Sequence, residues 1–386
     1  MQLPSPFGFI RLFFRRDSRV LMNQYDWSLL ERLCAIHAVS GREDAMTAYI
    51  RDTIRPLVDE VSVDNLGNVV GILKGAKHPN HRLMLQAHMD ELGLIVRYIT
   101  EDGFLRIERV GGVPEKSLLG QRMDVLTDDN RLIPGYVGTK SHHITSSDEK
   151  FKVPAVHDMF IDIGLTSREA VEQAGIQVGD PVTYHPNYHR FGDGMICSKA
   201  LDNRASVFIL LEALKSFAAQ RPPCTIIFSF TVLEEFSIRG SLPTVTATKP
   251  HAILSLDITI AADTPIDKPL HPVAMRKGPA IKMMDFHGRG TLGGLFSSPK
   301  LRRFIEGIAK QENIPLQREV IVGVITDPAF QLYLDDKGYV IAGLSIPHRY
   351  SHASIQMCHE TDMVQMIQLV DAAARSFTPE LDLSRG

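Results

Sequence analysis

Three apolar runs of strand length occur in the chain, at residues 81–88 ("HRLMLQAH"), 224–233 ("CTIIFSFTVL") and 251–259 ("HAILSLDIT"). Continuous apolar runs of this length are typical of strands that are buried on both faces of a sheet. Segments with apolar residues at helical spacing lie between and around them. The pattern therefore predicts an α/β unit in which helices cover a mixed sheet.

Helical spacing predicts five helices and a hairpin around these strands. The first helix is expected at 26–37, and the next follows Ser40 and Glu43, whose S-x-x-E spacing predicts a capping box. Residues 60–75 read as two short strands around a turn. An amphipathic helix is expected at 205–219, and the last two helices are expected at 298–313 and 363–377.

The middle of the chain has a different pattern of hydrophobic and polar residues. From Gly93 to about Arg190, short β-like runs are separated by turn formers, and only 167–175 has a helical pattern. Regularly spaced short strands predict a small β-barrel or sandwich. We therefore expect a discontinuous α/β catalytic domain at 22–92 and 191–386, and an inserted β domain at 93–190 that serves as a lid or in oligomerisation.

Composition narrows the class of protein. The chain has 386 residues, of which 44% are hydrophobic and 23% charged, and a formal net charge of −3, so nothing indicates binding to nucleic acid. Four dispersed cysteines predict neither disulfides nor a thiolate zinc site, which fits the cytoplasm. Residues 1–21 match neither a secretory signal nor a membrane span, so we expect a disordered leader and no membrane association.

Polar side chains follow each buried run. His88 and Asp90 follow the first, the pair Glu234 and Glu235 follows the second, and Asp257 lies in the third. Because ligands gather at the carboxyl edge of strands in open α/β sheets, these groups are expected to converge. Two further residues are expected at the same edge, Asp202 before a helix and His352 after the extended segment 339–347.

Two imidazoles and several carboxylates without a thiolate suit two divalent ions of zinc, cobalt or manganese. Five residues supply ligands, with Asp202 as the bridge: His88, Asp202, Glu235, Asp257 and His352. In extended backbone the paired glutamates would point to opposite faces, which leaves Glu234 as general base. Asp90 is expected to complete the catalytic set by holding the second nitrogen of His88.

Each piece alone has an ordinary explanation. A His-x-Asp pair often makes a surface hydrogen bond, an acidic pair is usually solvated, and Asp202 could cap the helix that begins near Ala205. The ordered combination after apolar strands favours the metal site. The remaining histidines, including His37 and His185, are expected at the surface or in hydrogen bonds, without convergent carboxylates.

Five motifs occur in a fixed order: "AHMDELG", "KALDNR", "LEE" followed by "RGS", "LDITIAADTP" and "SIPHRYSH". With these motifs the chain resembles the tetrahedral di-metal aminopeptidases, the family that includes glutamyl, leucyl and deblocking aminopeptidases and relatives from sugar operons. The insert between His88 and Asp202 also matches this family. Related di-metal deacylases and carboxypeptidases have their extra domain after the glutamate pair.

The resemblance implies a fold of the di-zinc exopeptidase type and a homo-oligomer of twelve subunits in a tetrahedron. It implies that Asp202, Glu235 and His352 hold one ion and that His88, Asp202 and Asp257 hold the other. Departures such as "TKSHHI" at 139–144 and "SHASIQMCHE" at 351–360 leave the ligands in place. These departures affect which N-terminal side chain of a substrate the enzyme would prefer.

The resulting hypothesis is a metalloaminopeptidase that hydrolyses the N-terminal peptide bond of short peptides. A water shared by the two ions would lose its proton to Glu234 and attack the scissile carbonyl. Three alternatives stay open at this point. They are deacylation of N-acyl amino acids, a catalytically silent binding protein on the same fold, and a metal-free glycan hydrolase that would need two flanking carboxylates.

Overall fold

Four parallel strands form the centre of a twelve-stranded sheet in the computed structural model, which describes residues 25–267, 272–288 and 292–385. Their order is β12 (Cys224–Thr231), β3 (His78–His88), β13 (Ala252–Ile260) and β17 (Ile341–Arg349). Because neighbouring strands run the same way, their carboxyl ends lie at one edge. The predicted mixed α/β sheet is confirmed.

Antiparallel strands extend this sheet on both sides. The predicted hairpin of β1 (Glu60–Val63) and β2 (Val69–Leu73) pairs with β12. Beyond β17 come β18 (Gln356–His359), β11 (Met195–Ser198) and β10 (His189–Phe191). A branch from β17 consists of β14 (Ala280–Phe286), β15 (Gly294–Phe296) and β16 (Gln317–Val322).

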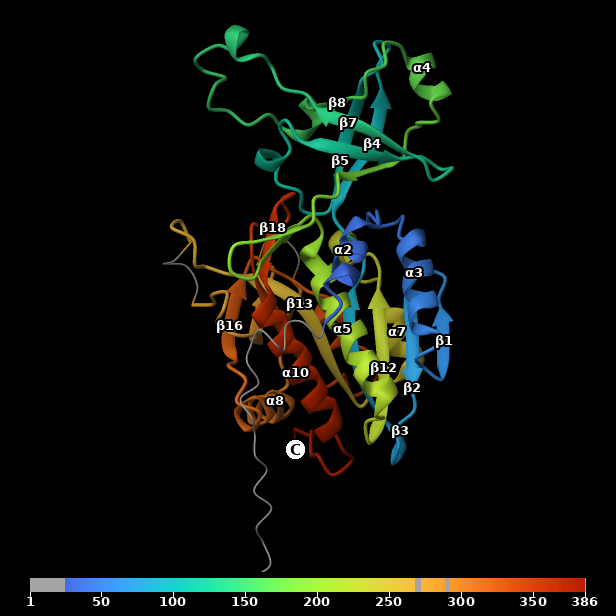
Figure 1. The fold of residues 1–386 in the computed structure, drawn as a ribbon, viewed down its shortest axis with the longest axis vertical. Helices are drawn as coiled ribbons and strands as arrows, with labels where there is room; N and C mark the ends of the chain where they lie inside the picture. Colours follow the sequence, from blue (N-terminus) through green and yellow to red (C-terminus); the bar gives the residue numbers. More distant parts are fainter. Residues whose placement is uncertain (1–24, 268–271, 289–291, 386) are drawn as a thin grey trace, which may run out of the picture.

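Helices cover both faces of the sheet (Figure 1). One face packs against α2 (Trp27–Ala35), α5 (Leu201–Ala219), α8 (Pro299–Gln311) and α10 (Glu360–Ser376). The other face packs against α7 (Leu242–Thr248) through Val245, near α9 (Pro328–Gln331). None of the described helices has both the length and the apolar character needed to cross a bilayer.

The expectation of an amphipathic helix at 205–219 was wrong. Helix α5 is buried continuously from Leu201 to Leu214. The face that would otherwise meet solvent is covered, because α2 and α10 pack beside this helix while the sheet lies beneath it. A helix enclosed on all sides needs no polar face, so its run of apolar residues reflects its central position in the core.

The inserted segment forms a closed six-stranded barrel with its own hydrophobic core, above the α/β body in Figure 1. The order around the barrel is β4 (Gly93–Ile99), β5 (Leu105–Val110), β8 (Phe160–Asp162), β7 (Leu132–Val137), β6 (Arg122–Leu126) and β9 (Pro181–Tyr184). The expected helix is α4 (Arg168–Gln173). The division at residues 93 and 190 stays a prediction, and the expected leader lies outside the described residues.

A buried ion pair next to the insert also binds a residue of the barrel. Glu91 accepts hydrogen bonds from Lys199 Nζ at 2.7 and 2.8 Å, from the Thr183 hydroxyl at 3.0 Å and from the Ala38 backbone N–H at 3.0 Å. Burial opposes ionisation of Glu91, but the ammonium of Lys199 holds the pKa of this carboxyl below its usual value. Three segments far apart in sequence therefore meet at one carboxylate.

Replacing Lys199 with Met is expected to lower the free energy of unfolding by about 3–5 kcal/mol, because it leaves the Glu91 charge buried without its main partner. Urea unfolding followed by circular dichroism measures this loss. The matched control is Lys74→Met, which removes a solvent-exposed pair with Glu60 and should leave the free energy of unfolding nearly unchanged. Equal losses in the two variants would contradict a structural role for the buried pair.

Candidate metal centre

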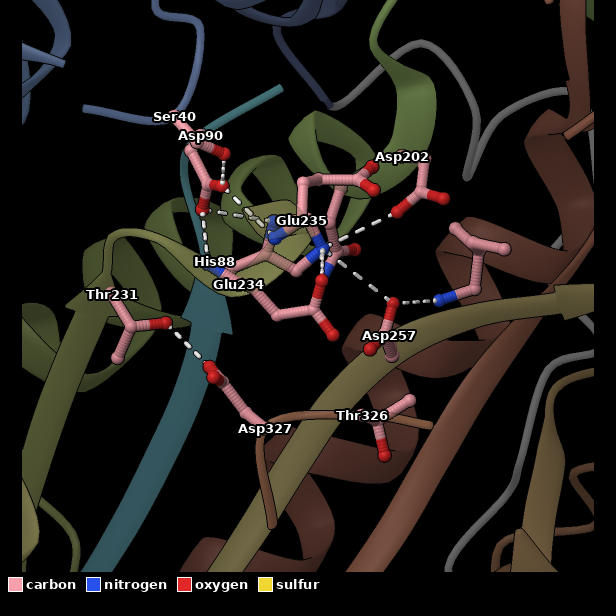
Figure 2. A network of polar contacts seen from close by, with 12 residues as sticks. Ser40, His88, Asp90, Asp202, Thr231, Glu234, Glu235, Asp257, Thr326 and Asp327 are labelled. Atoms are coloured by element: carbon pink, nitrogen blue, oxygen red, sulfur yellow. Dashed lines mark hydrogen bonds and ion pairs between the residues drawn. The ribbon is translucent and has the colours of Figure 1, made fainter. Parts of the chain in front are cut away.

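All seven side chains predicted for the site lie together at the carboxyl edge of the parallel strands. This edge faces the barrel in Figure 1, and Figure 2 labels all of these residues except His352. His88 ends β3, and Asp257 lies in β13 next to it. Glu234 and Glu235 lie shortly after the end of β12, and His352 lies shortly after the end of β17. Asp202 reaches the same place from the first turn of α5.

Asp202 lies between the two histidines. Its Oδ1 is 3.3 Å from His88 Nε2, and its Oδ2 is 3.5 Å from His352 Nε2. The backbone N–H of Asp202 donates to Gln356 Oε1 at 2.9 Å, which fixes the start of α5. Burial opposes ionisation, yet the hydrogen bonds with His352 and His88 hold the pKa of Asp202 far below its usual value. One carboxylate thus presents an oxygen to each imidazole.

The other carboxylates divide between the two histidines. His88 Nε2 lies 3.8 Å from Asp257 Oδ1 and 3.9 Å from Glu234 Oε2. His352 Nε2 lies 3.8 Å from Glu235 Oε2. Two sets of possible ligand atoms result, each within 4.8 Å: one from His88, Glu234 and Asp257, and one from Asp202, Glu235 and His352.

Both imidazoles are oriented through their second nitrogen. His352 Nδ1 is 2.9 Å from the Gly112 carbonyl, so Nδ1 donates and Nε2 is the ring nitrogen that faces the carboxylates. A Cβ at Gly112 would approach the His352 ring to 2.8 Å, so this close approach requires glycine. His88 Nδ1 lies 3.4 Å from Asp90 Oδ1. Partners of this kind are usual behind histidines that bind metal.

The crowding of buried carboxylates in this cluster favours the binding of cations. Burial and then the charge of Asp202 raise the pKa of Glu235 to about 8 and that of Asp257 to about 7, although the histidines oppose this shift. Glu235 Oε1 is buried and has no hydrogen-bond partner in the described part of the chain. Nitrogen and oxygen donors without sulfur suit zinc, cobalt or manganese, so the residues present fit two divalent ions.

The turn that carries the two glutamates is held by side chains from other segments. Leu233 has a left-handed backbone (φ 59°), and its N–H donates to Glu43 Oε1 at 3.1 Å. The next two backbone N–H groups, of Glu234 and Glu235, donate to the two oxygens of Asp90, each at 3.1 Å. The Val232 N–H before them donates to Asn68 Oδ1 at 3.0 Å. Four consecutive backbone N–H groups are thus bound by oxygens of three side chains, those of Asn68, Glu43 and Asp90.

Two expectations about this region were wrong. The glutamate pair was expected in extended backbone, but it opens the short helix α6 (Glu234–Ser237) because Asp90 binds the first N–H groups of that helix. Ser40 and Glu43 were expected to form a capping box. Helix α3 (Asp44–Ile54) has no side-chain cap, and Ser40 instead donates its hydroxyl to Asp90.

Sequence reasoning missed Asn68, Glu43 and Gly112 as contributors to the site. Each acts through a contact with a segment distant in sequence, and their local sequence patterns indicated a turn, a cap and a loop. His37 and His185 are hydrogen-bonded, as expected, but they share a carboxylate that the sequence did not indicate. His37 Nε2 and His185 Nδ1 lie 3.0 and 2.9 Å from the same oxygen of Asp124 in the barrel.

Comparison with known proteins finds relatives that cover most of this chain. SgcX of Escherichia coli (strain K12) is 38% identical over 338 residues, which are 88% of this chain and 90% of SgcX. The structure of aminopeptidase APDkam598 from Desulfurococcus kamchatkensis is 36% identical and superposes with a TM-score of 0.87, covering 93% of this chain and 97% of that one.

The TET1 peptidase of Pyrococcus horikoshii, which can assemble into a tetrahedron or a large octahedral shell, is 27% identical with a TM-score of 0.80. The alignment covers 91% of this chain and 99% of TET1. The sequence profile of the M42 glutamyl aminopeptidase family matches residues 67–369, which confirms the resemblance drawn from the motifs. The chain belongs to this family of metalloaminopeptidases.

Proposed function

We propose that the protein removes the N-terminal residue from short peptides with a centre of two divalent ions. His88, Asp202 and Asp257 would hold one ion, and Asp202, Glu235 and His352 the other. The single observation that carries this proposal is the position of Asp202, whose two oxygens lie 3.3 and 3.5 Å from the two imidazoles. A carboxylate in this position is suited to bridge two ions.

When bound, the two ions would supply the Lewis acidity that activates water and polarises the scissile carbonyl. Glu234 is the general base of this proposal. Burial and neighbouring carboxylates raise its pKa well above the usual range, although His88 opposes this. The Glu234 carboxylate would take a proton from the attacking water and return it to the leaving amine nitrogen. Asp90 would serve catalysis by orienting His88 and by fixing the turn that carries Glu234.

Chelation is expected to abolish hydrolysis of aminoacyl-p-nitroanilides, because the buried carboxylates would lose the ions that balance them. Readdition of Zn²⁺, Co²⁺ or Mn²⁺ should restore it. The assay compares these anilides with N-acetyl amino acids under the same conditions. Faster release of acetate than of nitroaniline would favour deacylation, and hydrolysis that survives chelation would argue against a metal centre.

Replacing Glu234 with Gln is expected to lower kcat by about 10²–10⁴-fold while both ions stay bound, because only the proton acceptor is removed. Elemental analysis measures the metal content and steady-state kinetics measures kcat. Asp202→Asn is the comparison variant, and it should lose metal as well as activity. A fully active, metal-replete Gln variant would remove Glu234 from the role of base.

We also propose that the protein assembles into a closed oligomer of twelve chains in the cytoplasm. The assembly is supported by the dodecameric structure of the related PhTET1, which is 26% identical with a TM-score of 0.79. Location in the cytoplasm is supported by the four cysteines, which are all buried and form no disulfide.

Light scattering of the purified protein is expected to give a mass of twelve times the 43.0 kDa of one chain. The reason is that the fold shared with PhTET1 includes the inserted barrel as well as the α/β body. Sedimentation velocity at several concentrations provides the control for reversible association. A monodisperse monomer or dimer would contradict the proposed assembly.

A further inference from the structure

A cavity of about 640 Å³ opens directly onto the metal centre. Besides Asp202, Asp257 and the two glutamates, its walls come from the end of β13, from α6 and from the loop that precedes α9. Besides polar residues such as Thr259, Thr326 and Ser351, the lining includes six large apolar residues: Phe236, Ile238, Ile258, Ile260, Val324 and Ile325. We infer that this cavity receives the side chain of the N-terminal residue and that the enzyme prefers peptides beginning with an uncharged, apolar residue.

This inference rests on the proposed function, because it names the substrate class of the same site. The described residues that line the cavity include no Lys or Arg, and no Asp or Glu outside the metal centre. With two ions bound, Asp202, Glu235 and Asp257 would be occupied, and Glu234 would face the attacking water as the proposed base. His287 is then the one other titratable group on the wall. A charged N-terminal side chain would lose its hydration without gaining a counter-ion, which opposes its binding.

The hydroxyl groups of the wall are engaged elsewhere. Thr326 donates to Asp285 Oδ2 at 2.7 Å, and Thr259 donates to Glu319. Figure 2 shows the Thr326 oxygen turned away from Asp257. Ser351 Oγ lies 2.9 Å from His348 Nδ1. These hydroxyls therefore bind groups behind the cavity wall, which makes the wall less polar than its residue types suggest.

A positive charge behind the cavity wall is also paired with acids. Lys282 is 1% exposed, and its ammonium lies 3.6 Å from Glu319 and 3.8 Å from Asp285. It balances the two acids that accept from the wall threonines. An acidic N-terminal residue would find this charge enclosed behind the wall. The same acids are equally closed to a basic residue.

Backbone conformation supports the choice of an apolar wall. Ile238 has a left-handed backbone (φ 59°), which is disfavoured for a β-branched residue and would be relieved by Gly or Asn. It ends α6, four residues after Glu234, and its side chain lines the cavity. Strained residues of this kind cluster at ligand sites. Phe236 on the same short helix is 67% exposed and available to contact the ligand.

The first arm of the test measures kcat/KM of the metal-loaded enzyme for leucyl-, glutamyl- and lysyl-p-nitroanilide. Calorimetry of the same protein with free L-leucine, L-glutamate and L-lysine provides a readout that is independent of turnover. We expect the leucyl substrate to exceed both charged ones by about tenfold or more, in line with the discrimination available to an apolar pocket. Leucine should also bind most tightly. Glutamyl or lysyl hydrolysis as fast as leucyl hydrolysis would overturn the inference.

The two readouts separate this inference from the proposed function. If no anilide is cleaved but leucine binds in preference to the charged amino acids, the peptidase proposal fails and the apolar site stands. If a charged substrate is cleaved fastest, the peptidase proposal stands and the apolar site falls. Absence of both hydrolysis and preferential binding overturns both.

The second arm places a charge on the wall. Ile260→Asp is expected to shift the ratio of leucyl to lysyl kcat/KM by about tenfold toward lysine, because the new carboxylate pairs with the substrate ammonium. Phe236→Asp, at a more exposed position, should shift the ratio in the same direction and covers the case in which Ile260→Asp fails to fold. Val320→Asp is the matched control. Val320 is 58% exposed on β16 outside the cavity, so its replacement should leave the ratio unchanged. An unchanged ratio in the folded cavity variants would overturn the assignment of this cavity.

Discussion

The burial of several carboxylates around two imidazoles is the constraint on which this structure depends. Asp202, Glu234 and Asp257 are each less than a tenth exposed, and none of the described lysines and arginines forms an ion pair with them. Burial opposes ionisation of these groups and the charge of Asp202 adds to it, although His88 opposes the shift, so the pKa of Asp257 rises to about 7. Divalent cations would resolve this repulsion, and the surrounding backbone is arranged to keep the ligands in place without them.

That backbone is held by bonds to consecutive amides after β12. Asp90 accepts from two of them and also lies beside His88, so one carboxylate orients an imidazole and fixes the position of both glutamates. The left-handed Leu233 that precedes them is unfavourable by itself. Its bond to Glu43 and the neighbouring bond to Asn68 compensate for this strain. The position of Glu234 therefore depends on residues up to 190 positions away.

The sequence was sufficient for the parts of the site that depend on local patterns. The ends of buried strands are visible as apolar runs, so His88, Asp257 and the glutamate pair could be expected at one edge of the sheet. The conformation of the glutamate turn could not be predicted, because distant acceptors determine it. Ser40 and Glu43 match a capping box locally, yet both bind partners across the fold. Likewise, His37 and His185 meet at Asp124 only because the barrel folds back onto the α/β body.

The position of the insert between His88 and Asp202 makes the barrel part of the site. The loop after β5 supplies the Gly112 carbonyl that orients His352, and Pro114 from the same loop lines the cavity. The buried pair of Glu91 and Lys199 is a second contact with the barrel, because Thr183 of β9 donates to Glu91. A shift of the barrel relative to the sheet would therefore turn His352 away from Asp202.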